Sequence, residues 1–195
     1  RKKGIYAVEI RDGDKLIEAR VSTGDNDILL GTRNGKSIRF SEEQIRPSGR
    51  KTMGVKGITL SSEDDRLVGM LLIKREGTTV LVATEKGFGK RTEISQYRAQ
   101  KRGGKGVLTM KTTDKVGKMV TIKEVVDKDD LMIITNQGVL IRQPVSQIRA
   151  IGRATQGVKL IKLGEGTLVS SITRIMSEED GGDENDSAEP KDNTE

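Results

Sequence analysis

A repeat of about 51 residues constrains this 195-residue chain more than any other feature of its sequence. Glycines and arginines recur without a gap at intervals of 52 and then 51 residues. The recurring sets are Gly35, Gly87 and Gly138; Arg39, Arg91 and Arg142; Arg46, Arg98 and Arg149; Arg50, Arg102 and Arg153; and Gly54, Gly106 and Gly157. A period near 50 residues is typical of propellers and related blade arrays, in which one unit cannot bury its apolar face alone.

The pattern inside each unit predicts β-strands throughout. Each unit opens with a short run of Leu, Ile and Val, and a glycine then supplies the positive φ that a tight hairpin requires. A second strand ends at the first recurring arginine of the unit, which is Arg39, Arg91 or Arg142, and a 13-residue loop follows this strand. Third strands are expected after the Gly-Val pairs, and fourth strands at 67–73, 119–126 and 168–175. The sequence therefore predicts an all-β, propeller-like fold with four strands in each unit.

These signals divide the chain into blades at 23–74, 75–126 and 127–176, preceded by a partial blade over 1–22. The partial blade should hold two strands, at 4–10 and 16–21. A propeller closes with about 4–8 blades, and three and a half blades would leave unpaired strand edges. We therefore expect the chain to be the C-terminal part of a longer protein.

Composition excludes most enzyme chemistry. The chain has no Cys and no His, which removes zinc fingers, thiol nucleophiles and every imidazole acid or base. We therefore expect no catalytic, cofactor-binding or metal-binding residue in it. Four aromatic residues are too few for the stacking platforms that hold single-stranded nucleic acid. No run approaches the ~18 apolar residues of a membrane span, and a cytoplasmic location is expected.

The net charge of +6 hides two opposite parts. Residues 178–195 carry nine acids and one lysine, whereas the body up to Ser177 carries 34 Lys and Arg against 20 Asp and Glu. A basic body indicates a polyanion as partner. The acidic tail, 177–195, is predicted to be disordered. It either competes with the ligand for the body or only improves solubility.

Duplex DNA is the expected partner, and the recurring arginines are the first candidates to bind it. They fall at the end of the second strand (Arg39, Arg91, Arg142), early in the loop (Arg46, Arg98, Arg149) and late in it (Arg50, Arg102, Arg153). Lys51, Lys101 and Lys105 add charge, and Gly103 and Gly104 would let backbone amides approach a phosphate. Phosphate contacts give affinity without reading sequence. The other interpretation is that these arginines brace neighbouring loops through carbonyl groups.

The heptapeptide Gln100-Lys101-Arg102-Gly103-Gly104-Lys105-Gly106 resembles the Q-R-R-G-G-K-G box of DNA gyrase A, with one Arg changed to Lys. The surrounding repeat is similar to the C-terminal domain of that family over residues 4–176. The resemblance implies a six-bladed β-pinwheel whose blades share strands and which wraps DNA during ATP-dependent negative supercoiling. In that family the box belongs to the first blade, whereas the loop here corresponds to the next-to-last blade.

The resemblance also implies the partners. They are duplex DNA, the rest of DNA gyrase A, and gyrase B, on the bacterial nucleoid, with no membrane and no small-molecule substrate. The catalytic tyrosine, ATP and Mg²⁺ of such an enzyme belong to other domains, so this chain should have no activity alone. Two alternatives stay open. One is the homologous C-terminal domain of topoisomerase IV, and the other is a protein-interaction propeller, although the chain has no Trp and no Gly-His…Trp-Asp signature.

Overall fold

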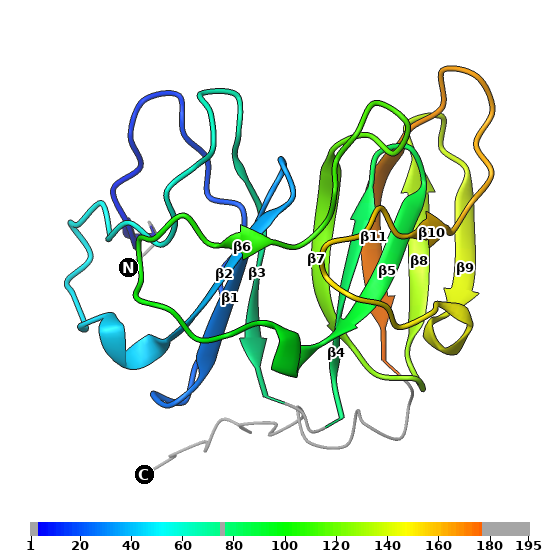
Figure 1. Cartoon of the computed structure of the whole chain (residues 1–195). Coiled ribbons are helices and arrows are strands. Elements are labelled where there is room, and N and C mark those ends of the chain that lie inside the picture. The colour runs from blue at the N-terminus through cyan, green and yellow to red at the C-terminus, as the bar shows by residue number, and fades with distance from the viewer. Residues whose placement is uncertain (1–3, 75–76, 177–195) are drawn as a thin grey trace, which may run out of the picture.

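The computed structural model describes residues 4–74 and 77–176. In this part of the chain, strands and single turns of 3-10 helix form three antiparallel sheets that stand side by side (Figure 1). No helix in the described residues is long and apolar enough to cross a membrane. The all-β, propeller-like fold expected from the repeat is confirmed.

Each unit contributes three long strands to a sheet of its own. In each sheet the first strand lies in the centre, between the second strand and the last. The strands are β1 (Asp27–Thr32), β2 (Lys36–Ser41) and β3 (Leu67–Ile73); β4 (Thr79–Thr84), β5 (Phe88–Glu93) and β7 (Met119–Val125); and β8 (Asp130–Thr135), β9 (Leu140–Pro144) and β11 (Val169–Ile175). Strand β4 is buried along its whole length because the first and third sheets pack against its two faces, whereas β8 alternates between buried and half-buried residues. The strands expected at the start and end of each unit are therefore found.

In the second and third units, the strand expected after the Gly-Val pair, the third in its unit, pairs with the sheet of the preceding unit, which corrects the expectation of four strands within each unit. Strand β6 (Val107–Leu108) pairs with Lys36 and Ser37 of β2, and β10 (Val158–Lys159) pairs with β5. Each is only two residues long and follows a loop that lies against the preceding unit. Strands β6 and β10 thus tie successive units together, in agreement with the strand sharing that the resemblance implied.

The hairpin glycines show how closely these units approach. Gly35 has φ +84°, and a Cβ placed on it would lie 2.2 Å from the carbonyl oxygen of Met110 in the next unit. The position therefore requires glycine both for its backbone conformation and for the contact. Gly138, at the same position of the last unit, has φ +79° but nothing within 4 Å.

Three expected strands, in two segments, do not form. Residues 4–22 contain no strand, and their apolar side chains are largely exposed, with Tyr6 at 91% and Leu16 at 63%. No strand begins directly after Gly54 either, and Val55 is 54% exposed. Strand pairing is stable only when a face of the strand is buried. Residues 16–22 lie beside β3, where the Met70 amide donates to Glu18, but their apolar side chains stay exposed.

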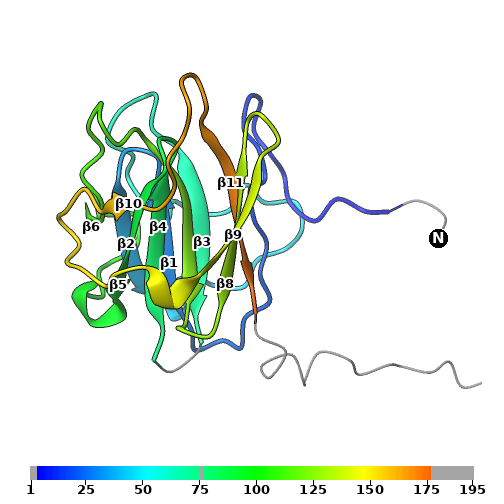
Figure 2. The ribbon, with the colours of Figure 1, turned by 90° about the vertical axis from the view of Figure 1, so that its right-hand side faces the viewer.

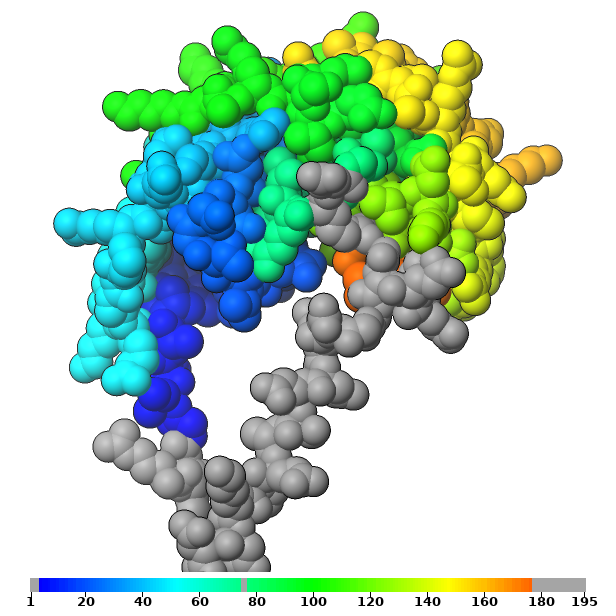
Figure 3. Space-filling view, turned by 90° about the horizontal axis from the view of Figure 1, so that it is seen from below, coloured from blue at the N-terminus to red at the C-terminus, as the bar shows by residue number. Residues whose placement is uncertain are grey.

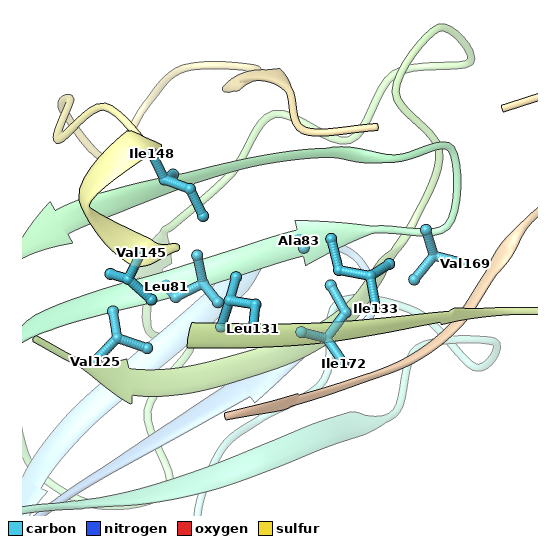
Figure 4. Close-up of a cluster of buried hydrophobic side chains, with 9 residues drawn as sticks. All are labelled: Leu81, Ala83, Val125, Leu131, Ile133, Val145, Ile148, Val169 and Ile172. Carbon is cyan, nitrogen blue, oxygen red and sulfur yellow. The ribbon is translucent and has the colours of Figure 1, made fainter. Parts of the chain in front are cut away.

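The core lies between adjacent sheets. One cluster joins the second and third units through Leu81, Val125, Leu131 and Ile172, together with Val145 and Ile148 (Figure 4). Val145 begins the helical turn η3 (Val145–Gln147), which follows the second strand as η1 (Glu42–Gln44) and η2 (Ile94–Gln96) do in the other units. These turns start the long loops on the outer side of the sheets.

The loops and short strands gather on one side of the molecule. Figure 2 shows β6 and β10 on the side opposite the segment that leads to the N-terminus. Seen from below in Figure 3, the units follow one another along a curved edge, from blue and cyan through green to yellow. The repeat thus places the same loop of each unit along one outer edge.

Candidate nucleic-acid interface

Three segments form what we call the basic rim: residues 45–60, 97–112 and 148–163. Each contains the loop that follows a helical turn and the stretch where a short strand is expected. Together they carry thirteen Lys and Arg and no Asp or Glu. Clustered charge of one sign on a surface raises the local concentration of the opposite charge. This rim is therefore the candidate surface for a polyanion.

Two of the arginines near the ends of the second strands, Arg39 and Arg91, act mainly as braces. Arg39 donates from Nε to Asp27 at 2.8 Å and from Nη1 to the carbonyl oxygen of Tyr97 in the next unit at 3.2 Å. Arg91 is buried, donates from Nε to the carbonyl oxygen of Ile148 at 2.7 Å and pairs with Asp127. For both residues, the bracing interpretation describes the contacts that the structure shows.

Arg142, the third member of this set, differs. It donates from Nε to Asp130 at 2.7 Å, and its side chain is 64% exposed. In the described residues no further loop covers β9, so the carbonyl groups that engage Arg39 and Arg91 have no counterpart there. Arg142 is therefore open to solvent while paired with one carboxylate.

Among the arginines late in the loops, Arg50 of the first unit is exposed, whereas Arg102 and Arg153 contact the preceding unit. Arg102 is half-buried and donates to the carbonyl oxygens of Gln44 at 3.3 Å and Lys56 at 2.5 Å. Arg153 donates to the carbonyl oxygen of Leu108 at 2.8 Å and lies 5.9 Å from the centre of the Tyr97 ring. Both were expected to bind phosphate, yet their donors hold the preceding unit. The reason is that these loops pack on a neighbouring sheet, which the sequence pattern does not display.

The box-like loop is a clasp between the first and second units. The amide of Gly103 donates to the carbonyl oxygen of Gly57 at 2.7 Å, and the Gly103 carbonyl accepts from the Thr59 hydroxyl at 2.7 Å. The carbonyl of Gly104 accepts from the Thr59 amide at 2.8 Å. The Gly103 amide, expected to approach a phosphate, is thus already engaged.

The two ends of the loop are held in the same way. The amide of Gln100 donates to the carbonyl oxygen of Arg39 at 2.8 Å, and the Gln100 side chain is half-buried. Gly106 has φ +67°, and a Cβ there would lie 2.3 Å from the carbonyl oxygen of Ser37. Between these anchors, Lys101 and Lys105 are exposed. The clasp therefore presents two lysines on a fixed backbone.

Eleven cationic side chains of the rim are exposed. Seven are among the residues predicted from the sequence: Arg46, Arg50, Lys51, Arg98, Lys101, Lys105 and Arg149. The other four, Lys56, Lys111, Lys159 and Lys162, were missed. The signal that could have found them is the repeat itself, because Gly-Val-Lys occurs at 54–56 and again at 157–159, and Lys111 and Lys162 share one repeat position.

This arrangement suits contact with phosphates and little else. Loop lysines and arginines on a curved edge can reach a phosphate backbone, but they cannot read bases without entering a groove. In residues 4–74 and 77–176, no group of acidic side chains is placed to hold a metal ion. The rim can therefore bind a polyanion through charge.

Comparison with known proteins places these features in a family. The model of the family described as DNA gyrase C-terminal domain, beta-propeller, matches the chain at residues 26–74, 78–125 and 129–175. DNA gyrase A of Staphylococcus epidermidis (strain ATCC 12228 / FDA PCI 1200) is 47% identical over 180 residues, which is 92% of this chain and 20% of that protein. DNA gyrase A of Staphylococcus aureus (strain NCTC 8325 / PS 47) is 44% identical over 194 residues, 99% of this chain and 22% of that protein. The chain spans about a fifth of the length of these relatives.

Two solved structures share the fold. A DNA gyrase A C-terminal domain superposes with a TM-score of 0.81 at 24% identity, over 89% of this chain and 58% of that one. The C-terminal domain of a DNA topoisomerase IV superposes with a TM-score of 0.82 at 23% identity, over 87% of this chain and 53% of that one. At these identities the likeness concerns the fold alone.

Proposed function

The chain belongs to the DNA gyrase C-terminal domain family, and on that premise we propose that its basic rim binds duplex DNA without sequence preference and bends it around the outer edge of the sheets. The observation that carries this proposal is the rim itself, with thirteen cations and no acids along one curved edge. Eleven of those cations are exposed and can approach phosphates.

The energetics of bending favour such a surface. Smooth bending of a 20–30 base-pair duplex costs about 1–6 kcal/mol. Charge-assisted contacts to phosphates, repeated in each unit, can offset that cost, because every neutralised phosphate releases counterions. Since the contacts are distributed over three segments, the duplex gains most of them only if it follows the curve. Binding and wrapping are then one event.

The wider role rests on the family. We propose that the chain acts as part of a bacterial DNA gyrase A, together with the rest of that protein and with gyrase B, on DNA of the nucleoid in the cytoplasm. Wrapping would there support ATP-dependent negative supercoiling, with ATP, Mg²⁺ and the catalytic residues supplied by other domains. The chain alone should bind DNA and should not cleave it.

A plasmid relaxation assay tests the wrapping. The chain is incubated with relaxed plasmid, and a type I topoisomerase relaxes the supercoils that the protein does not constrain. The protein is then removed and the topoisomers are separated. Wrapping predicts a shift in linking number that grows with protein concentration and disappears at high salt. Binding should also be equal for duplexes of unrelated sequence. An unchanged linking number at saturating binding would overturn wrapping, and a flat salt response would favour a protein-binding propeller instead.

A further inference from the structure

A lysine is buried at the contact between the second and third units. Lys90 lies on β5 and is fully buried. Its ammonium donates to the carbonyl oxygens of Gly152, at 2.7 Å, and Arg153, and to the Thr155 hydroxyl at 3.1 Å. All three acceptors belong to the third segment of the basic rim. A buried charge is stable only when it is well paired, and here one side chain gathers three oxygens of one loop.

Its neighbours on β5 also donate hydrogen bonds to this loop. Thr92 donates to the carbonyl oxygen of Ile151 at 2.8 Å, and Arg91 donates to that of Ile148. The remaining charge beside Lys90 is the guanidinium of Arg153, which donates away from it to Leu108. Burial, and then the charge of Arg153, lower the pKa of Lys90 to about 8, so the ammonium form predominates at neutral pH.

The first and second units meet without such a lysine. At the repeat position of Lys90 the first unit has Ile38, and at the position of Thr155 the second unit has Gly104. A Cβ on Gly104 would lie 3.5 Å from Cδ1 of Ile38. One contact is therefore apolar and closely packed, whereas the other is an ammonium in a cage of oxygens. Equivalent contacts between successive units are therefore stabilised in two different ways in this chain.

We propose that Lys90 is a positioning residue of the basic rim. Its ammonium fixes residues 149–157 on the second sheet, so that Arg149 and Lys159 stay in line with the cations of the preceding loop. This role rests on the proposed function, because it concerns how the rim is presented to DNA. Lys90 itself is buried and does not touch the ligand.

Two variants of the full chain separate this role from others. Lys90→Met removes the ammonium with little change of volume. Lys90→Ile with Thr155→Gly copies the contact between the first two units. The control is Lys86→Met, which removes one charge from an exposed lysine outside the rim. Hydrogen exchange of residues 149–157 and 97–106 is measured by mass spectrometry, and affinity for a duplex is measured by fluorescence anisotropy.

The expected result is local. In Lys90→Met, residues 149–157 should exchange about tenfold faster, because three buried acceptors lose their donor, while 97–106 stay protected. Duplex affinity should fall about threefold or more, and the double variant should restore both readouts. Lys86→Met should not change the exchange rate of either loop. Should Lys90→Met fail to fold, Thr155→Ala, which removes one acceptor, is expected to give a smaller acceleration confined to the same loop.

Equal acceleration in both loops, or none, would overturn the assignment. So would a loss of affinity in Lys90→Met with no change in exchange, because Lys90 would then act through its charge alone. The exchange measurement does not involve DNA. Failure of the native chain to bind duplex DNA would therefore overturn the proposed function, while the exchange data would still decide whether Lys90 holds the loop.

Discussion

Replacing Lys101 and Lys105 together by Ala should weaken DNA binding and leave the fold unchanged. Both side chains are exposed on the box-like loop, whose backbone is held by other groups. Arg102 is left in place because its guanidinium holds the carbonyl groups of Gln44 and Lys56. The double variant therefore removes two rim charges without opening the clasp.

The magnitude follows from counterion release. Each phosphate contact contributes about 0.9 to the slope of log affinity against log salt concentration. If about six of the exposed rim cations contact phosphates, affinity should fall about a thousandfold between 50 and 200 mM salt. With two contacts removed, the slope should decrease by about 1.8 and the fall over the same range should be about a hundredfold.

The assay is fluorescence anisotropy of a labelled duplex at four salt concentrations within that range. The matched control replaces Lys15 and Lys115, two exposed lysines outside the basic rim, by Ala. Both variants lose the same net charge, and both should keep the thermal midpoint of the native chain, since exposed charges contribute little to stability. Only the rim variant should change the slope.

Equal effects of the two variants would refute this reasoning, because binding would then depend on net charge and not on the rim. An unchanged slope in the rim variant would show that Lys101 and Lys105 do not contact phosphates. A lower thermal midpoint in that variant alone would show that these lysines stabilise the fold.

Three further predictions concern single groups and the tail. Arg102→Ala should lower the free energy of unfolding by about 1–2 kcal/mol, because two carbonyl groups lose their donor, whereas Arg50→Ala, at the same repeat position but exposed, should not; urea unfolding compares the two. The unfolding free energy should rise by up to about 1.4 kcal/mol per pH unit between about pH 8 and 10. In that window the unfolded amine of Lys90 keeps its proton, with an ordinary pKa of 10.5, while the folded amine, with a pKa of about 8, has lost it. In the Lys90→Ile, Thr155→Gly variant, the free energy of unfolding measured at pH 7.5 and 9.5 should show no such rise. Removing residues 178–195, which lie outside the described residues, should tighten DNA binding most at low salt. If the chains with and without these residues bind DNA equally well at both salt concentrations, the tail is only a solubility device.

The regular parts of the fold were predictable because their signals are local. A glycine after a short apolar run predicts a hairpin whether or not the neighbouring unit is known, and β1 and β2 form around Gly35 as expected. The pairing of β6 with β2 was not predictable from periodicity, because a two-residue strand is too short to show alternation. The strands expected within residues 4–22 also depended on partners that the sequence pattern does not reveal.

The candidate site was predicted in part for a similar reason. Seven of the eleven exposed rim cations were among the residues predicted from the sequence, and the four that were missed are Lys56, Lys111, Lys159 and Lys162. The repeat could not indicate which charges a neighbour would engage. Arg102 and the carbonyl of Lys56 lie 46 residues apart in sequence, and Arg153 and the carbonyl of Leu108 lie 45 apart. Such contacts follow from the stacking of units, and no signal within one unit records them.

Bracing and DNA binding are not exclusive roles for a guanidinium. Arg102 and Arg153 donate to carbonyl groups, which are neutral, so each keeps its full positive charge at the rim. At physiological ionic strength that charge acts over about 8 Å, so it adds to the field of the neighbouring exposed lysines. The strand-end arginines are different, because Arg39 and Arg91 also pair with carboxylates, which cancel much of their field. The partner of each arginine therefore decides whether it contributes to the rim's potential, and Arg102 and Arg153 do so while holding the units together.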